Sequence, residues 1–153
     1  MSVTSMSVTT DNAVEAKQYA TFRVDDLFFG VDVTEVQEVL RFHEMTSVPA
    51  ADPVIEGLIN LRGQIVTAFN IRRRLGLEVR DGDEEPMNVV VRGADGAVSL
   101  MVDEIGDVIE VSQDDFEAPP ETIDARTREV LDGVYKLPDQ LLLVLSTDKV
   151  LQA

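Results

Sequence analysis

The sequence contains no cysteine and no tryptophan, and it has a single histidine, His43, in 153 residues. Without cysteine it has no disulfide bonds, no thiolate metal ligands and no cysteine nucleophile. A lone histidine provides no pair of imidazoles for a common zinc motif, so we expect His43 to be an ordinary surface or edge residue. Because only eight residues are aromatic, the core must consist mainly of aliphatic side chains.

Positive charge is also scarce. Three lysines and ten arginines stand against 29 aspartates and glutamates, which gives a formal net charge of −16. This charge repels nucleic-acid phosphates, so we expect no nucleic-acid partner. An acidic, lysine-poor surface suits a salt-rich cytoplasm, and we therefore hypothesise a halophilic origin.

Long apolar runs are absent as well. No stretch of about 18 apolar residues is available to cross a bilayer, so we expect no direct membrane insertion. The N-terminus has no basic region followed by an apolar one, which argues against a signal peptide. We expect the Ser/Thr-rich residues 1–16 to be a disordered arm. We expect residues 17–153 to form one domain, or two small subdomains that share a core, with an internal boundary near 80–87.

Sequence signatures of enzymes are missing. The chain has no GxxxxGK[ST], GxGxxG, HExxH or GxSxG motif. The acidic run "DGDEEP" at 81–86 lacks the oxygen-ligand spacing of an EF-hand, so we expect a solvated loop there. We therefore expect no catalytic residue, no metal site and no cofactor.

Alternating apolar and polar residues, with turn residues between short runs, predict an all-β fold of small barrels. Segment 33–42 is compatible with a helix or a strand, because helical spacing of valines coincides with β-branched content. A short C-terminal helix is expected, with its N-cap at Thr147 or Asp148. The expected strands are a pair at 18–24 and 27–33, two around a turn at Arg62–Gly63, a hairpin plus a third strand within 87–111, and a hairpin within 130–146 whose second arm is apolar on both faces and therefore central.

One predicted strand has an apolar residue where a polar one is expected. Within "IGDVIEV", strict alternation puts Ile105, Ile109 and Val111 on one face with Asp107, and Val108 on the opposite face. A solvated strand would carry a polar residue at that position. Val108 is therefore either core on the second side of the sheet or an apolar anchor for a partner.

The segment 57–77 contains four of the ten arginines and no carboxylate, which is unusual in so acidic a chain. Arg62 and, upstream, Glu38 are charged residues within apolar strings. They form either a buried ion pair or part of a recognition surface, on which the arginine binds a partner's carbonyls or carboxylate. The spacing is equally compatible with both. We expect arginines 72–74 to be solvated counter-charges on a short helix closed by Gly76.

The string "VIEGLINLRGQIVTAFNIRRRLG" at 54–76 resembles the CheW family of chemotaxis coupling proteins. The resemblance is carried by the following residues: Gly57, Asn60, Leu61, Arg62, Gly63 and Ile65. The segments "FRVDDLFFGVDVTEVQEVL", "SLMVDEIGDVIEV" and "DQLLLVLSTDKVL" are similar to other family elements, in the same order and at the same spacing. The resemblance covers the chain from about residue 17 to its end.

The resemblance implies two intertwined five-stranded, SH3-like β-barrel subdomains with short helices. It implies a non-catalytic adaptor that links the cytoplasmic tips of methyl-accepting chemoreceptors to the regulatory domain of a CheA-type histidine kinase. Such an adaptor would be cytoplasmic and associated with membrane-bound receptor arrays. The positions that match kinase and receptor coupling are Val36, Glu38, Gly57 and Arg62, and those that match receptor contact are Ile105 and Val108. With this resemblance, Val108 and Arg62 are better interpreted as functional than as structural residues.

Some positions depart from the family pattern. Thr67 and Asn70 stand where the family usually has Pro and Asp, and Ser99 replaces a frequent Gly. The alternatives to an adaptor are a regulatory module detached from a kinase or from a receiver-fused coupling protein, and an unrelated enzyme or β-barrel binding module.

Overall fold

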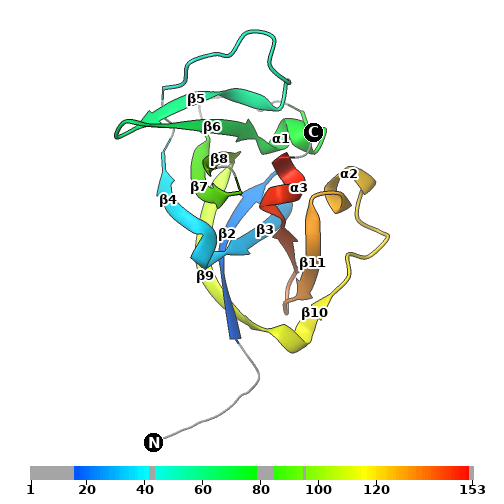
Figure 1. Cartoon of the computed structure of the whole chain (residues 1–153). Helices are drawn as coiled ribbons and strands as arrows, with labels where there is room; N and C mark the ends of the chain where they lie inside the picture. The colour runs from blue at the N-terminus through cyan, green and yellow to red at the C-terminus, as the bar shows by residue number, and fades with distance from the viewer. Residues whose placement is uncertain (1–15, 42–43, 79–84, 95, 152–153) are drawn as a thin grey trace, which may run out of the picture.

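The computed structural model describes residues 16–41, 44–78, 85–94 and 96–151. The expected disordered arm (apart from Ala16), His43 and most of the acidic loop lie outside these residues. Ala16 itself is the first residue of a strand. The rest of the chain forms two β-sheets joined by short helical turns (Figure 1).

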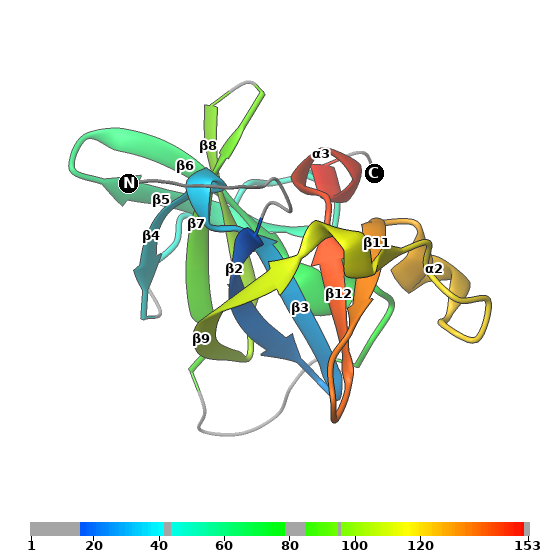
Figure 2. The ribbon, with the colours of Figure 1, turned by 90° about the horizontal axis from the view of Figure 1, so that it is seen from below.

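The first sheet combines the two ends of the chain. Its strand order is β10-β11-β12-β3-β2-β9, and Figure 2 shows β9, β2, β3, β12 and β11 side by side. Neighbouring strands are antiparallel except β12 and β3, which are parallel. The strands are β2 (Ala16–Val24), β3 (Leu27–Asp32), β9 (Glu104–Ser112), β10 (Phe116–Glu117), β11 (Leu131–Lys136) and β12 (Leu141–Leu145).

The second sheet is built from the middle of the chain, in the order β4-β7-β8-β6-β5. Because the chain enters this sheet after β3 and returns to the first sheet at β9, the two subdomains are intertwined, as predicted. The strands are β4 (Val36–Leu40), β5 (Ile55–Leu61), β6 (Gln64–Asn70), β7 (Met87–Gly93) and β8 (Gly96–Val102). The predicted all-β, two-subdomain fold is confirmed, and the first sheet has β10 as a sixth, two-residue strand.

The described residues contain five short helical segments, four between strands and one after the last strand. They are η1 (Val33–Glu35), α1 (Ile71–Arg74), η2 (Gln113–Asp115), α2 (Ala125–Arg128) and α3 (Thr147–Leu151). The ambiguous segment 33–42 therefore divides into one helical turn and strand β4. The predicted N-cap of α3 is wrong: the Ser146 hydroxyl accepts a hydrogen bond from Lys149 N at 3.3 Å, so Ser146 holds the cap position.

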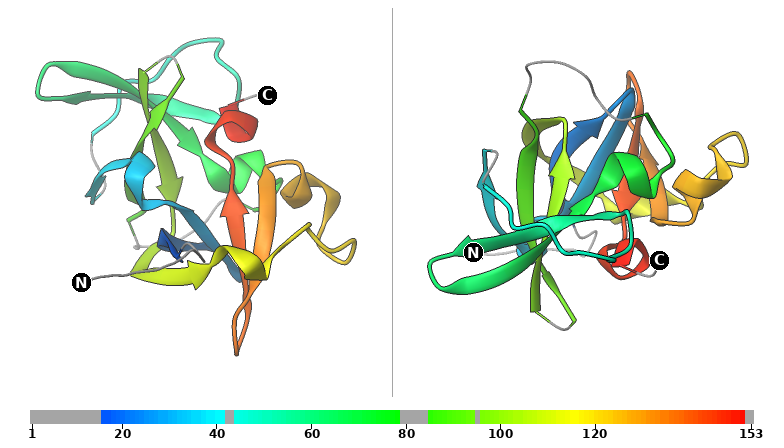
Figure 3. Two further views of the ribbon diagram at one scale, coloured as in Figure 1. Left: turned by 60° about the horizontal axis from the view of Figure 1, so that its bottom comes forward. Right: turned by 90° about the horizontal axis from the view of Figure 1, so that it is seen from above.

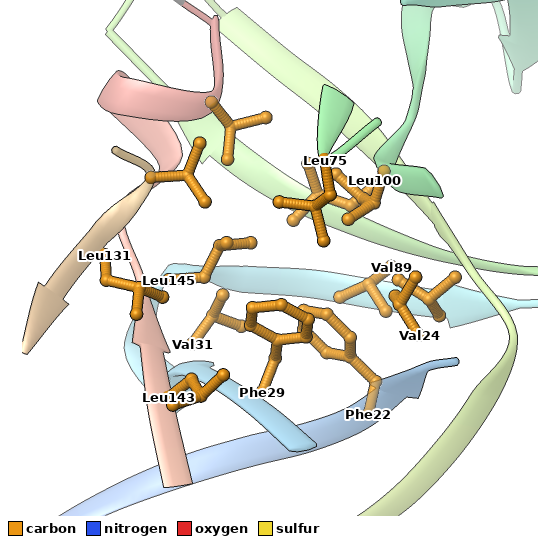
Figure 4. Close-up of a cluster of buried hydrophobic side chains, with 14 of the residues drawn as sticks. Phe22, Val24, Phe29, Val31, Leu75, Val89, Leu100, Leu131, Leu143 and Leu145 are labelled. Carbon is orange, nitrogen blue, oxygen red and sulfur yellow. The ribbon is translucent and has the colours of Figure 1, made fainter. Parts of the chain in front are cut away.

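The main core lies between the two sheets. Phe22 and Phe29 stack at its centre with ring centroids 5.8 Å apart, and both are fully buried. Figure 4 shows them between leucines of the first sheet and residues such as Val89 and Leu100 of the second. One shared core thus joins the subdomains, and truncating one of these phenylalanines to alanine is expected to cost about 3–5 kcal/mol.

Strand β12 has a core on each side. Leu143 and Leu145 point into the main core, whereas Leu142 and Val144 pack with Tyr19 in a separate cluster on the outer side. Its neighbours are β11 and β3. The prediction that this strand is central is therefore confirmed.

Two of the three arginines after β6 are structural. Arg74 donates hydrogen bonds to the backbone oxygens of Val150 and Lys149, both at 3.1 Å, and so holds α3. The side chain of Arg72 is only 16% exposed and bonds to Asp103. The expectation of solvated counter-charges was wrong for Arg72 and Arg74, because their guanidinium groups satisfy a carboxylate and carbonyls that the fold brings near them. Arg73 is exposed and lies 3.5 Å from the Glu56 carboxylate, as expected of a solvated counter-charge.

Candidate interaction surface

The β5–β6 hairpin presents Arg62 at its tip. Arg62 and Gly63 have φ angles of 52° and 87°, so this two-residue loop has the positive φ values of a type I′ turn. The Asn60 side chain accepts a hydrogen bond from Gly63 N at 3.0 Å and stabilises the turn. In both views of Figure 3 the green hairpin projects from the body of the molecule. An arginine in this conformation is unfavourable by roughly 1–2 kcal/mol.

Glu38 of β4 holds the Arg62 guanidinium in a planar fork. Arg62 Nη1 donates to Glu38 Oε2 at 2.9 Å, and Nη2 donates to Oε1 at 2.8 Å. These hydrogen bonds raise the pKa of Arg62. The two residues therefore do form an ion pair, but not a buried one: the Arg62 side chain is 77% exposed and that of Glu38 is 18% exposed. The pair therefore lies at the surface, and most of the Arg62 side chain is open to solvent.

Val36 lies two residues before Glu38 but on the opposite face of β4. The register with β7 shifts between these positions, with Val36 opposite Val91 and Glu38 opposite Val90. Because Val90 and Val91 are adjacent, their side chains point to opposite faces. Val36 accordingly packs against the main core, while Glu38 is turned toward the hairpin tip. Val36 thus supports the strand that carries Glu38.

Gly57 allows a loop to pass close over β5. A Cβ atom at this position would lie 2.7 Å from the oxygen of Thr46 and 3.0 Å from the Cβ of Met45. Thr46 and Leu58 exchange two backbone hydrogen bonds of 2.9 and 2.8 Å across this approach. A side chain at residue 57 would push the loop away, so Gly57 shapes the edge of the hairpin rather than contacting a partner itself.

Val108 is exposed on β9. Its relative exposure is 54%, so the alternative that it belongs to a second-side core is wrong. Ile105 is partly buried against the main core. Val108 pairs with Ala20, and Ile105 pairs with Phe22, with a register shift between these pairs. The prediction that Ile105 shares a face with Ile109 was wrong, because this β-bulge interrupts the alternation.

The structure brings some of the candidate residues together. Glu38 and Arg62 are in contact, and Gly57 belongs to the same hairpin. Ile105 and Val108 lie on the other sheet, and in Figure 1 the hairpin is at the top of the molecule and β9 in its lower half. The candidate surface is therefore divided into a hairpin part and a β9 part.

Sequence reasoning missed exposed apolar residues beside these candidates. Ile65 is 59% exposed and Val39 is 42% exposed. Val39 follows Glu38 on β4, but it pairs with Val89 of the main core and therefore lies on the face opposite Glu38. Ile65 lies two residues after Gly63 on β6, and its neighbour Val66 is fully buried. Which side of each strand points to solvent depends on packing, so the pattern of one apolar string does not reveal it.

Among residues 16–41, 44–78, 85–94 and 96–151, no group of three or more His, Asp or Glu side chains is arranged to hold a metal ion. Within the same part of the chain, no helix has the length and apolarity that a membrane crossing requires.

The two-sheet fold presents an arginine held by a carboxylate on one sheet and an exposed valine on the edge strand of the other, which is the arrangement of a protein-interaction module. The sequence profile of the CheW-like domain family matches residues 18–153, and the chain belongs to this family. The chain is thus a CheW-type coupling adaptor of chemotaxis, and the predicted family and function are confirmed.

Individual relatives agree with this assignment. The chain is 30% identical to the chemotaxis protein CheW of Treponema pallidum, over 89% of this chain and 82% of that protein. It is also 30% identical to chemotaxis protein CheW of Bacillus subtilis, over 85% and 83% of the two chains. The crystal structure of the scaffolding protein TtCheW from Thermoanaerobacter tengcongensis matches with a TM-score of 0.81 and 26% identity, over 91% of this chain and 94% of that one.

Proposed function

We propose that this adaptor holds the regulatory domain of a CheA-type histidine kinase and the cytoplasmic tip of a methyl-accepting chemoreceptor in one complex. It works in the cytoplasm at membrane-bound receptor arrays, and it catalyses no reaction and needs no cofactor. The observation that carries this proposal is the Arg62 guanidinium, held by Glu38 at the tip of a projecting hairpin and 77% exposed.

In this proposal the hairpin part couples the kinase and the receptor. Arg62 supplies a charged, planar donor for a partner's carboxylate or carbonyl groups, and Glu38 restricts its orientation before binding. Val36 and Gly57 act through packing, since one supports β4 and the other admits the loop over β5. Exposed apolar area on the same hairpin comes from Ile65, two residues after Gly63.

The β9 part contacts the receptor. Val108 offers an exposed apolar anchor, and Ile105 packs beneath it against the main core. An anchor of this kind contributes to binding by leaving water when the partner docks. Holding two partners on separate surfaces makes the binding of the second nearly intramolecular, so the adaptor acts through effective concentration rather than chemistry.

A pull-down with purified kinase regulatory domain and receptor tip tests the proposal. Wild-type protein should retain both partners, and Arg62→Ala should lose at least one. Lys136→Ala is the matched control, because it removes an exposed ion pair with Glu117 on the other sheet and should change neither interaction. Glu38→Gln weakens the hold on Arg62 without removing it and should have an intermediate effect. Retention of both partners by Arg62→Ala would contradict the proposed role of the hairpin.

The surface charge supports a second proposal, namely that the protein works in a salt-rich environment. Only 13 basic residues oppose 29 acidic ones, so the folded chain repels itself at low ionic strength. Within such a surface, the Arg62 end of the carboxylate-free segment 57–77 stays attractive to acidic groups of a partner. High salt then screens indiscriminate repulsion while the close Arg62 contact remains.

A further inference from the structure

Strands β2 and β9 pair in two different registers on either side of Thr21. On one side Ala20 is opposite Val108, and on the other side Phe22 is opposite Ile105. One residue of β2 therefore faces two residues of β9, Gly106 and Asp107, which is the arrangement of a β-bulge. The bulge lies between the two candidate receptor-contact residues.

This bulge decides where those two residues point. In a regular strand, side chains three positions apart are on opposite faces. Ala20 and Phe22 are two apart, so they share a face of β2, and their partners Val108 and Ile105 are brought to that same face. Ile109, by contrast, pairs with Tyr19 and packs in the outer cluster. Without the extra residue, Ile105 and Val108 would be separated by the sheet.

The hydroxyl of Thr21 occupies the bulge. Thr21 is 2% exposed, and its Oγ1 donates a hydrogen bond to the backbone oxygen of Asp107 at 2.5 Å. A Cβ at Gly106 would lie 2.5 Å from the same hydroxyl oxygen and 3.6 Å from Thr21 Cβ. The hydroxyl therefore takes the space that any other residue at 106 would need, while its own hydrogen bond goes to the backbone of the adjacent residue of the bulge.

Strand β9 is an edge strand of the first sheet. It lies at the end of the first sheet, with β2 as its neighbour, so among the described strands its position is fixed from one side. An edge strand held from one side slips more readily than a central one, and a slip of one residue exchanges its two faces. A polar side chain that fits one bulge geometry opposes such a slip.

We propose that Thr21 and Gly106 are positioning residues for receptor binding: the Thr21 hydroxyl, seated against Gly106 and bonded to Asp107, holds Ile105 and Val108 on one face of β9. This inference rests on the proposed receptor-contact role of β9. It assigns no partner contact to Thr21 itself, which is buried.

The first experiment compares variants of Thr21. Thr21→Val keeps the shape of the side chain and removes the hydrogen-bond donor, so β9 should populate other registers. If about a tenth of the molecules keep the binding-competent register, the affinity for a purified receptor tip should fall about tenfold. Thr21→Ser keeps the hydroxyl and should retain affinity within about twofold of wild type, well short of that loss. Ser99→Ala is the matched control, since it removes a buried hydroxyl that donates to Asn88 in the other sheet. It should leave receptor affinity unchanged even if it lowers the melting temperature.

The second experiment is a double-mutant cycle of Thr21 and Gly106, the residues that meet at the bulge. Gly106→Ala should weaken receptor binding because its methyl group collides with the hydroxyl, and Thr21→Ala removes the colliding atom. In the double variant the two losses should therefore be less than additive. Strictly additive losses would overturn the proposed seating of the hydroxyl against Gly106. The double variant also keeps the test decisive if Thr21→Val fails to fold.

NMR separates this inference from the proposed function. Cross-strand NOEs between residues 20 and 108, and between 22 and 105, report the register directly. They should be present in wild type and Thr21→Ser, and lost or broadened in Thr21→Val. If wild type does not bind the receptor tip, the receptor role fails while the NOEs still decide the register. If Thr21→Val keeps these NOEs and wild-type affinity, the positioning role is overturned.

Discussion

Arg72 and Asp103 form a two-pronged ion pair that ties the two subdomains together. Arg72 Nε and Nη2 donate to the two carboxylate oxygens of Asp103 at 2.9 and 2.6 Å. Arg72 belongs to α1 of the second subdomain, and Asp103 immediately precedes β9 of the first. The same carboxylate accepts a hydrogen bond from Asp25 N at 2.7 Å, in the turn between β2 and β3. The start of the proposed receptor strand is thus fixed to both subdomains.

Arg72→Ala should lower the free energy of unfolding by about 3 kcal/mol. The pair is mostly buried, with side-chain exposures of 16% and 10%, so removing one partner leaves the Asp103 charge poorly compensated. Asp103 also raises the pKa of Arg72 through these hydrogen bonds. Urea denaturation measures the loss. Replacing both residues, as Arg72→Met with Asp103→Leu, should cost less than the sum of the single changes, and a fully additive result would contradict the coupling.

Glu35→Gln should stabilise the protein slightly near pH 7. Burial raises the pKa of Glu35, and so do the neighbouring carboxylates of Asp32, Asp148 and Asp132. When the folded-state pKa of a carboxyl is raised, the free energy of unfolding falls as the pH rises from the unfolded-state pKa through the folded-state pKa of that group. Because solvent screens this exposed position, we expect a gain of only about 0.5 kcal/mol in the free energy of unfolding.

Thermal melting at pH 7 and pH 4 in low salt checks this prediction. The gain should be present at pH 7 and smaller at pH 4, where Glu35 is already largely protonated. Glu121→Gln is the control, since it changes the net charge equally at an exposed position on another part of the chain. An equal gain from both variants would show that net charge, rather than the carboxylates around Glu35, is responsible.

Asp32→Asn should have the opposite effect. Burial alone would raise the pKa of Asp32, but hydrogen bonds from the backbone and hydroxyl of Thr34 and the nearby Lys17 outweigh it and lower the pKa. Its stabilisation is therefore present above the unfolded-state pKa and is lost as pH falls through the lower, folded-state value. Asparagine keeps an oxygen that can cap the turn, so the substitution removes the charge and its ion pair with Lys17, and it should cost roughly 0.5 kcal/mol at pH 7, measured by urea denaturation. An unchanged midpoint would contradict a contribution from the carboxylate charge.

Val108→Asp should separate binding from folding. Because Val108 is 54% exposed, the charge stays in solvent and the melting temperature should change by no more than about 2 °C. Affinity for the receptor tip should fall at least about tenfold, since the charge must be desolvated on docking. Val91→Asp is the opposite control: Val91 is fully buried, and this change should unfold the protein. Unfolding by Val108→Asp would contradict its role as an anchor.

The sequence predicted the strands and turns but not their exceptions. Period-two alternation and the Arg62–Gly63 turn are local signals, so the β5–β6 hairpin was predictable from a few adjacent residues. The bulge at Thr21 was not, because it depends on contact with residues 106 and 107, far along the chain. The Arg72–Asp103 pair, 31 residues apart, was missed for the same reason. Asn70 is an intermediate case: it still caps α1 by accepting from Arg73 N, as its shape allowed.

Residue roles at the candidate surface were predictable to a similar extent. The pairing of Glu38 with Arg62 followed from their placement within apolar strings, but its exposure did not, because burial depends on how far the hairpin projects. Only the family resemblance indicated a role for Gly57. The residues that pass close to it, Met45 and Thr46, lie more than ten positions earlier in the chain, so the local pattern does not reveal the contact. Packing between segments distant in sequence is therefore the information that the sequence pattern lacked.

The melting temperature should rise with salt. At 0.1 M KCl the Debye length is about 10 Å, so neighbouring carboxylates still repel one another, whereas at 1 M it is about 3 Å. The net charge of −16 makes this repulsion larger in the compact state than in the expanded chain. We expect roughly 5 °C or more between 0.1 and 2 M KCl, which corresponds to about 2 kcal/mol for a domain of this size.

Salt also strengthens apolar burial, so the charge effect needs its own control. A variant with Asp26→Asn, Glu121→Gln and Asp139→Asn removes three exposed charges that lie away from the candidate surface. If repulsion dominates, this variant should melt higher than wild type at 0.1 M KCl, and the two should converge at 2 M, where the removed charges are screened. If apolar burial dominates, both proteins should gain equally from salt. A wild-type melting temperature that stays flat or falls as KCl increases would rule out the salt-rich environment, while the coupling role tested at Arg62 and Val108 would stand independently.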